Sequence, residues 1–215
     1  MAGCFILINS LYDPFILKRY KESGEPDLFC ADGGADLAYH FQMKPKAILG
    51  DLDSIRPEAL RFYEESGVEI IRYPSDKDFT DLDLLLSEVR RRGYSFVEIT
   101  CGTGGRTDHT LTNLFLMEKY YHLGLEIFYN SPSEEIFLVS GTRNFKGFMG
   151  NTISIIPVTD NLKIHSLKGL RYSAENLELR RGDSRGMSNI VTSTEWQISL
   201  EAGSALIIIN KTDTI

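Results

Sequence analysis

Two aspartates one residue apart follow a short apolar run in the first quarter of the chain. Residues 47–49 are apolar, Gly50 ends the run, and Asp51 and Asp53 come directly after it. Positions i and i+2 of an extended segment share a face, so both carboxylates are expected to point the same way at the carboxyl end of a strand. Carboxylates without His or Cys beside them suit Mg²⁺, which fills its remaining positions with water and phosphate oxygens. The alternative is a loop that only caps the helix expected from Pro57.

A second acidic group begins at Lys77 and contains Asp78, Asp81 and Asp83. Thr80 is suited to cap a helix that starts at Asp81, and acids in the first turn complement the helix dipole. This structural explanation covers much of the group. Three aspartates within six residues, beside a site that is already negative, also suggest that one of them completes a metal site.

Two glycine pairs come directly after expected strands and before expected helices. They are Asp32-Gly33-Gly34 and Gly104-Gly105. Glycine lets backbone N–H groups approach a ligand closely, and a helix N-terminus favours phosphate. A pair of glycines alone is also typical of a plain tight turn.

Arg106 follows the second glycine pair and offers a planar fork of donors that matches phosphate oxygens. Asp108 is expected on the helix face that turns toward the sheet, where a buried carboxylate needs a partner. His109 alone is more often a hydrogen-bonded structural residue than a catalyst. The sequence has no P-loop, no Gly-x-Ser-x-Gly elbow, no Cys-x-x-Cys and no His-Glu-x-x-His, which disfavours P-loop, nucleophilic and zinc hydrolase chemistry.

A further cluster of Arg, Gly and small polar residues lies between residues 168 and 189. Such a composition is common in solvated turns. Ser188 and Asn189, just before an apolar strand, could instead present a hydrogen-bonding edge to a heterocycle.

Apolar strand-like runs alternate with helix-length segments up to residue 122. The expected strands cover residues 4–9, 27–31, 47–49, 68–73 and 96–100, and the expected helices cover residues 14–23, 35–41, 57–66, 81–92 and 107–122. This alternation predicts a Rossmann-like α/β domain whose mostly parallel sheet has helices on both faces. Ligands of such folds bind at the carboxyl ends of the strands, where the acidic and glycine-rich turns are expected.

Short strand-like runs separated by Gly, Asn, Asp and Ser make up the rest of the chain. They cover residues 126–129, 136–139, 152–157, 162–166, 190–193, 197–200 and 205–209, with no helix-period segment between them. This pattern predicts a small antiparallel sandwich or barrel. We therefore expect an α/β domain over residues 1–143 and a β domain over residues 144–215.

Composition indicates an ordinary globular protein, with 215 residues, 42% hydrophobic and 25% charged. The 23 basic and 30 acidic side chains give a formal charge of −7, which argues against nucleic acid as a partner. An acidic protein that binds a phosphorylated ligand needs added positive charge, which a divalent metal supplies. Residues 1–10 lack a basic leader, and no apolar run reaches bilayer length, so a cytoplasmic location is expected. Three scattered cysteines, Cys4, Cys30 and Cys101, are expected in the core.

Six ordered blocks resemble the thiamine pyrophosphokinase family over nearly the whole chain. They are Asp-Gly-Gly-Ala at 32–35, Gly-Asp-Leu-Asp-Ser at 50–54, Lys-Asp-Phe-Thr-Asp at 77–81, Gly-Gly-Arg-Thr-Asp-His at 104–109, Lys-Gly-Leu-Arg-Tyr at 168–172 and Gly-Met-Ser-Asn at 186–189. The resemblance implies transfer of a pyrophosphoryl group from ATP to thiamine, giving thiamine diphosphate and AMP. It also implies a C-terminal β-sandwich that binds thiamine and a homodimer with shared active sites.

The resemblance also implies roles for individual residues. Mg²⁺ would be held by Asp51, Asp53 and Asp81, with Asp78 and Thr80 shaping the site beside it. The nucleotide would be lined by Asp32, Gly33, Gly34, Lys77, Thr80, Gly105, Arg106 and Asp108. Thiamine would contact Ser188 and Asn189, and also Tyr172, although Ser173-Ala174 depart from the more apolar pair expected there.

Two other functions remain open from the residues alone. A metal-dependent sugar-nucleotide transferase would use an Asp-x-Asp pair, but it leaves the blocks at 77–81 and 104–109 without a role. A non-catalytic thiamine or nucleotide sensor has little use for four clustered carboxylates.

Overall fold

The computed structural model describes residues 3–100, 102–103 and 106–211. The chain separates into two compact units, Met1–Ser131 and Pro132–Ile215. The sequence assigned residues 132–143 to the first domain. In the structure β7 (Glu134–Val139) pairs along its length with β14 (Ala205–Asn210), which makes it part of the second unit.

The first unit contains a parallel sheet in the strand order β6-β5-β1-β2-β3-β4. Its strands are β1 (Gly3–Leu7), β2 (Asp27–Ala31), β3 (Ala47–Gly50), β4 (Glu69–Arg72), β5 (Phe96–Thr100) and β6 (Glu126–Asn130). The sequence pattern grouped residues 126–129 with the short strand-like runs, although the boundary at residue 144 kept them in the α/β domain, and β6 pairs in parallel with β5. Residues 126–129 follow a helix and precede another strand, so the local sequence fits a strand of either part of the chain. Only the strand with which they pair decides the assignment.

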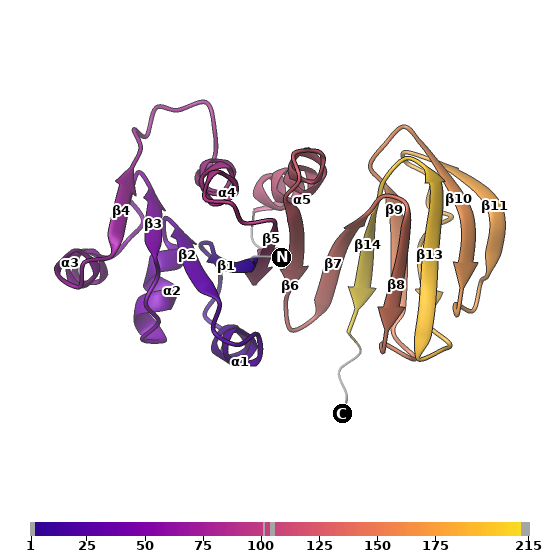
Figure 1. The fold of residues 1–215 in the computed structure, drawn as a ribbon, viewed down its shortest axis with the longest axis horizontal. Coiled ribbons are helices and arrows are strands. Elements are labelled where there is room, and N and C mark those ends of the chain that lie inside the picture. Colours follow the sequence, from indigo (N-terminus) through magenta and orange to yellow (C-terminus); the bar gives the residue numbers. More distant parts are fainter. Residues whose placement is uncertain (1–2, 101, 104–105, 212–215) are drawn as a thin grey trace. The chain divides into compact units, whose positions relative to one another are not determined.

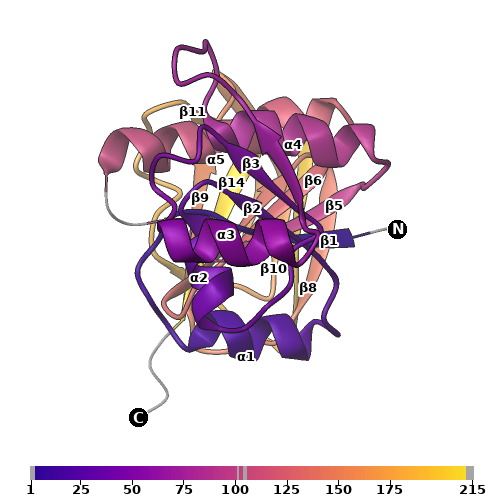
Figure 2. The same ribbon diagram turned by 90° about the vertical axis from the view of Figure 1, so that its left-hand side faces the viewer.

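Five helices connect these strands, as the alternation predicted. They are α1 (Phe15–Glu22), α2 (Gly34–His40), α3 (Pro57–Glu65), α4 (Asp81–Arg91) and α5 (Thr107–His122). Within this unit α1, α2 and α3 cover one face of the sheet, and α4 and α5 cover the other (Figures 1 and 2). The doubly wound α/β architecture expected from the sequence is confirmed.

Local chemistry explains the start and the orientation of α4. The Thr80 side chain accepts a hydrogen bond from the backbone N–H of Asp83, which is the expected N-cap. Its apolar stripe of Leu82, Leu85, Leu86 and Val89 is buried. The buried face therefore fixes α4 so that its acidic first turn stays at the carboxyl edge of the sheet.

Two of the three cysteines are core residues, as expected. Cys4 and Cys30 are buried free thiols, and burial raises the pKa of Cys4 to about 12. Cys101 lies outside the described residues.

The second unit is built from antiparallel strands, and residues 132–211 contain no helix. Four strands pair in the order β12-β9-β14-β7 and four in the order β11-β10-β13-β8. The strands not yet bounded are β8 (Thr142–Lys146), β9 (Thr152–Pro157), β10 (Asn161–Lys168), β11 (Ala174–Arg180), β12 (Asn189–Ile190) and β13 (Glu195–Ala202). The predicted β-sandwich is confirmed.

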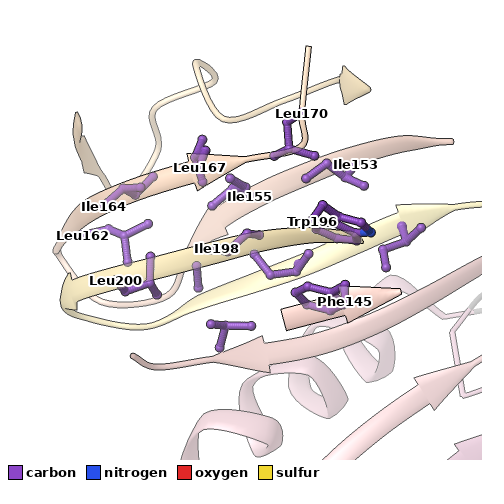
Figure 3. Close-up of a cluster of buried hydrophobic side chains, with 14 of the residues drawn as sticks. Phe145, Ile153, Ile155, Leu162, Ile164, Leu167, Leu170, Trp196, Ile198 and Leu200 are labelled. Carbon is purple, nitrogen blue, oxygen red and sulfur yellow. The ribbon is translucent and has the colours of Figure 1, made fainter. Parts of the chain in front are cut away.

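The core of the second unit lies between its two sheets (Figure 3). Isoleucines and leucines of β9, β10 and β13 pack around the ring pair of Phe145 and Trp196, whose centroids are 4.1 Å apart at 9°. Trp196 is 2% exposed, and its ring N–H donates to the carbonyl of Gly147. The sandwich thus has an apolar interior of its own, with its one indole N–H satisfied.

Among the described residues, no helix combines the length and the apolar character needed to cross a membrane.

Candidate active site

The turn after β3 holds the first two aspartates of the site. Gly50 has φ 153° and Leu52 has φ 67°, a left-handed conformation that a bulky residue rarely adopts. The Leu52 side chain is 6% exposed, so the unusual backbone turns it into the core. Asp51 and Asp53 consequently stay together at the edge of the sheet, where the Asp53 N–H donates to Asp51 Oδ1 at 3.3 Å.

Asp32, at the end of β2, joins this pair. One carboxylate oxygen from each of Asp32, Asp51 and Asp53 lies within 4.8 Å of the others. Asp32 Oδ2 accepts a hydrogen bond from the Ser54 hydroxyl, whereas Asp32 Oδ1 is buried and has no hydrogen-bond partner. A buried carboxylate oxygen of this kind is costly unless it receives a cation or a donor.

Asp81, in the first turn of α4, approaches Gly50 together with Asp32. A Cβ built on Gly50 would lie 3.1 Å from Asp32 Cβ and 3.2 Å from Asp81 Oδ1. Lys77 Nζ lies 2.8 Å from Asp81 Oδ1 and 3.8 Å from Asp51 Oδ2. A side chain at position 50 would therefore crowd Asp32 and Asp81, and glycine allows these two aspartates to lie close to the turn after β3.

The electrostatics of the cluster reflect crowding of like charges. The charge of Asp51, followed by burial and the charges of Asp32 and Asp81, raises the pKa of Asp53. Burial alone would raise the pKa of Asp51, but the Asp53 backbone N–H and the charge of Lys77 outweigh it and lower that pKa. Burial would lower the pKa of Lys77, but the close Asp81 carboxylate and the charge of Asp51 raise it. Four carboxylates facing one ammonium leave an excess of negative charge that a divalent cation would neutralise.

This donor set fits a hard metal ion. Every candidate ligand is a carboxylate oxygen, which Mg²⁺ prefers, and Asp32 Oδ1 has no other partner. The predicted ligands Asp51 and Asp53 group with Asp32, which the sequence assigned to the nucleotide. The third predicted ligand, Asp81, is not in this group but contacts Lys77, which also lies near Asp51. Asp78 is exposed on the loop before α4 and is not among the three grouped carboxylates.

The two glycines after Asp32 serve close packing. A Cβ on Gly34 would lie 2.3 Å from the Leu7 carbonyl oxygen, and one on Gly33 would lie 3.0 Å from the side chains of Asn9 and Ser54. The first turn of α2 is thereby held against the end of β1. This contact fixes the backbone beside the Asp32 carboxylate.

The orientation of Asp108, which pairs with Arg106, differs from the sequence-based expectation. Asp108 was expected to face the sheet, but its side chain is 62% exposed and forms a two-bond ion pair with Arg106, at 2.6 and 3.1 Å. The buried stripe of α5 runs through Asn113, Leu116 and Met117, and this helical phase turns Asp108 outward. Gly104 and Gly105 lie outside the described residues. Because both charges are exposed, the ion pair is weak and leaves Arg106 available to a stronger anionic partner.

The second unit has a cavity of about 290 Å³. Its lining includes Ile155, Leu179, Tyr172, Arg185 and Met187. An apolar wall with a few polar groups at its rim is the usual character of a small-molecule site.

Asn189, expected to present a hydrogen-bonding edge to a heterocycle, lines this cavity, but its side-chain amide is already bonded within the protein. It is 6% exposed, and its side-chain amide exchanges two hydrogen bonds of 2.9 Å with the backbone N–H and carbonyl of Tyr172. Tyr172 itself is 63% exposed, and Ser188 is exposed with φ 59°. Asn189 thus positions the Tyr172 loop at the rim of the cavity.

Sequence reasoning considered Ser54 only as a cap of the helix expected from Pro57, and it assigned no role to Asn9. Ser54 completes the Gly-Asp-Leu-Asp-Ser block and donates to Asp32, and that adjacency was the available signal. Asn9 carries no comparable motif and is recognised only by its contact with the Gly33 position.

Both units match known families. The catalytic domain of thiamin pyrophosphokinase matches residues 23–129, and the vitamin B1 binding domain of thiamin pyrophosphokinase matches residues 140–205. Thiamine pyrophosphokinase 1 of Arabidopsis thaliana is 30% identical over 204 residues, covering 83% of this chain and 75% of its own. Thiamine pyrophosphokinase of Bacillus subtilis (strain 168) is 29% identical over 171 residues, covering 79% of each chain.

The fold is shared with solved structures. The crystal structure of thiamine pyrophosphokinase from Bacillus subtilis has a TM-score of 0.86 at 22% identity, covering 98% of this chain and 99% of that one. Yeast thiamin pyrophosphokinase has a TM-score of 0.79 at 17% identity, covering 97% and 86%.

Proposed function

Because this chain belongs to the thiamin pyrophosphokinase family, we propose that it transfers the β- and γ-phosphates of ATP as one group to the hydroxyethyl oxygen of thiamine. The single observation that carries the proposal is the cluster of Asp32, Asp51 and Asp53, with Asp81 beside it, at the carboxyl edge of a parallel sheet. Ligands of α/β folds bind at that edge, and phosphoryl transfer requires charge neutralisation there.

We assign a Mg²⁺ ion to Asp51, Asp53 and Asp81, with Asp32 Oδ1 as a further oxygen donor. When bound, the ion neutralises charge on the phosphate oxygens and helps to hold the reacting groups in line. Its assignment is supported by the all-oxygen donor set and by the unsatisfied oxygen of Asp32.

The protein residues position the reactants. Arg106 exchanges its exposed partner Asp108 for phosphate oxygens, which it binds through its planar fork. The thiamine hydroxyl oxygen forms a bond to the β-phosphorus, the bond from that phosphorus to the α,β-bridging oxygen breaks, and AMP leaves. The hydroxyl proton passes to an aspartate of the cluster and then to solvent. No covalent intermediate with the protein is needed, because positioning and charge neutralisation lower the barrier.

We place thiamine in the second unit, at the cavity bordered by Tyr172 and Met187. The match of residues 140–205 to a vitamin B1 binding domain supports this assignment. The location in the cytoplasm stays a prediction.

We also propose a homodimer with shared active sites. A variant disabled at Asp53 and another disabled at Ser188 and Asn189 should each be inactive alone. Mixing them under subunit exchange should restore about a quarter of the wild-type rate, because half of the dimers are mixed and each has one intact site. Mixed dimers without activity would contradict the shared site.

The decisive experiment is release of AMP from ATP with and without thiamine, with products identified by ³¹P NMR. We expect AMP and a diphosphate ester in equal amounts, formed only when thiamine is present. A sugar-nucleotide transferase would give neither product, and a sensor would bind the ligands without turnover.

A further inference from the structure

Lys77 lies inside the acidic cluster and is largely removed from solvent. Its side chain is 13% exposed, compared with 15% for Asp51 and 26% for Asp81. Its ammonium nitrogen is 2.8 Å from Asp81 Oδ1 and 3.8 Å from Asp51 Oδ2. An ammonium in this position offsets part of the repulsion between carboxylates that come from different segments of the chain.

Lys77 contacts two carboxylates that the proposed function assigns to the metal ion. Asp81 and Asp51 belong to the proposed ligand set, and each carboxylate oxygen has a limited number of acceptor positions. An ammonium and a divalent ion at the same oxygens also repel each other strongly at such short range. Simultaneous occupation is therefore unfavourable.

The position of Lys77 in the fold permits it to move. It lies on the long connection between β4 and α4 (Figure 1), outside any helix or strand. A lysine is a point charge on a flexible four-carbon stem, so its head group can leave without a change in the strands.

We propose that Lys77 is an internal counter-ion which the metal displaces on binding, and that the released ammonium then binds phosphate oxygens of the nucleotide. This inference rests on the metal site of the proposed function. It makes metal binding and nucleotide binding cooperative, because the bare metal must expel Lys77 into solvent, whereas the nucleotide provides the ammonium with a new anionic partner.

The test measures Mn²⁺ affinity by electron paramagnetic resonance, in the absence of nucleotide and with a non-hydrolysable ATP analogue. The variants are Lys77→Gln, the charge-preserving Lys77→Arg, and the control Lys46→Gln. Lys46 also pairs with an aspartate, Asp27, at 2.6 Å, but it lies at the amino end of the strands.

We expect Lys77→Gln to bind bare Mn²⁺ about tenfold more tightly or better than wild type, because one competing positive charge is removed. The analogue should improve Mn²⁺ affinity less in this variant than in wild type. Lys77→Arg and Lys46→Gln should keep the wild-type affinity for bare Mn²⁺. Equal affinities for wild type and Lys77→Gln would overturn the proposal.

Two further measurements separate an error in the proposed metal site from an error in the role proposed for Lys77. Asp53→Asn should lose Mn²⁺ binding, and if it does not, the proposed metal site is wrong rather than the role of Lys77 alone. If Lys77→Gln is unfolded without metal, its refolding by Mn²⁺ supports the exchange of one cation for another. A variant that stays unfolded at saturating Mn²⁺ would show that Lys77 is a fixed structural cation and would overturn the inference.

Discussion

Substitution of Gly34 by alanine should destabilise the first unit and disturb the metal site together. The new Cβ would lie 2.3 Å from the carbonyl oxygen and 2.6 Å from the carbonyl carbon of Leu7, whereas ordinary contact begins at 3.4 Å. Both atoms are backbone atoms of the sheet, so α2 itself must move. Overpacking of this kind costs about 3 kcal/mol, reduced by up to about 1 kcal/mol because alanine favours a helix over glycine.

Gly33→Ala is the matched control, because it makes the same chemical change one residue away. Its Cβ would meet the side chains of Asn9 and Ser54 at 3.0 Å, and side chains can rotate aside. We therefore expect a loss of about 1 kcal/mol or less in this variant.

Urea unfolding of the two variants gives the free energies, and Mn²⁺ binding gives the effect on the site. Gly34→Ala should lower both, because a shift of the first α2 turn carries Asp32 with it. Equal stabilities of Gly33→Ala and Gly34→Ala would refute the idea that contact with the Leu7 backbone dictates glycine at position 34.

Three further predictions concern charge. Asp53→Asn should lower the rate of AMP release by at least about 100-fold, because it removes the charge of a proposed metal ligand at nearly constant volume. The control Asp160→Asn changes a side chain that is 87% exposed and should leave the rate unchanged. Arg106→Lys should lose about tenfold or more in kcat/KM, the value of one charge-assisted hydrogen bond, and a wild-type value would make Arg106 a surface residue. Hydrogen bonds from Arg91 and Arg92 lower the pKa of Glu88 from 4.5 to about 2. The ionised Glu88 therefore stabilises the folded state above pH 4.5, and this stabilisation is lost as the pH falls toward 2. Glu88→Gln should remove up to about 3 kcal/mol at neutral pH and flatten the acid limb of the stability curve, and an unchanged curve would contradict this pairing.

The order of elements in the first unit was predictable because continuous apolar runs and amphipathic stripes mark buried strands and helices. Residues 27–31, 96–100 and 107–122 have the predicted bounds. The missed strands, β8 and β11, have mostly exposed side chains, so they carry no such run. Pairing with β13 and β10, respectively, makes them strands, and long-range pairing is not written in a local pattern.

The sequence motifs of the candidate site were predictable, but the tertiary contacts of their side chains were not. The grouping of Asp51 with Asp53 followed from their place at the end of a strand, and Asp81 was expected beside them at the start of a helix. The phase of α5, which turns Asp108 outward, depends on which residues near Leu116 are buried, and the sequence offered no strong apolar stripe there. The use of the Asn189 amide by the Tyr172 backbone is also a tertiary contact that composition does not encode.

The stacked Trp196 has a practical consequence for spectroscopy. It is the one tryptophan of the chain and lies in the core of the second unit, whereas all helices of the described residues belong to the first. Tryptophan fluorescence therefore reports on the β-sandwich, and helical circular dichroism reports on the α/β unit. The two optical signals, recorded on one sample, divide the unfolding of this chain into its two halves without any label or truncation.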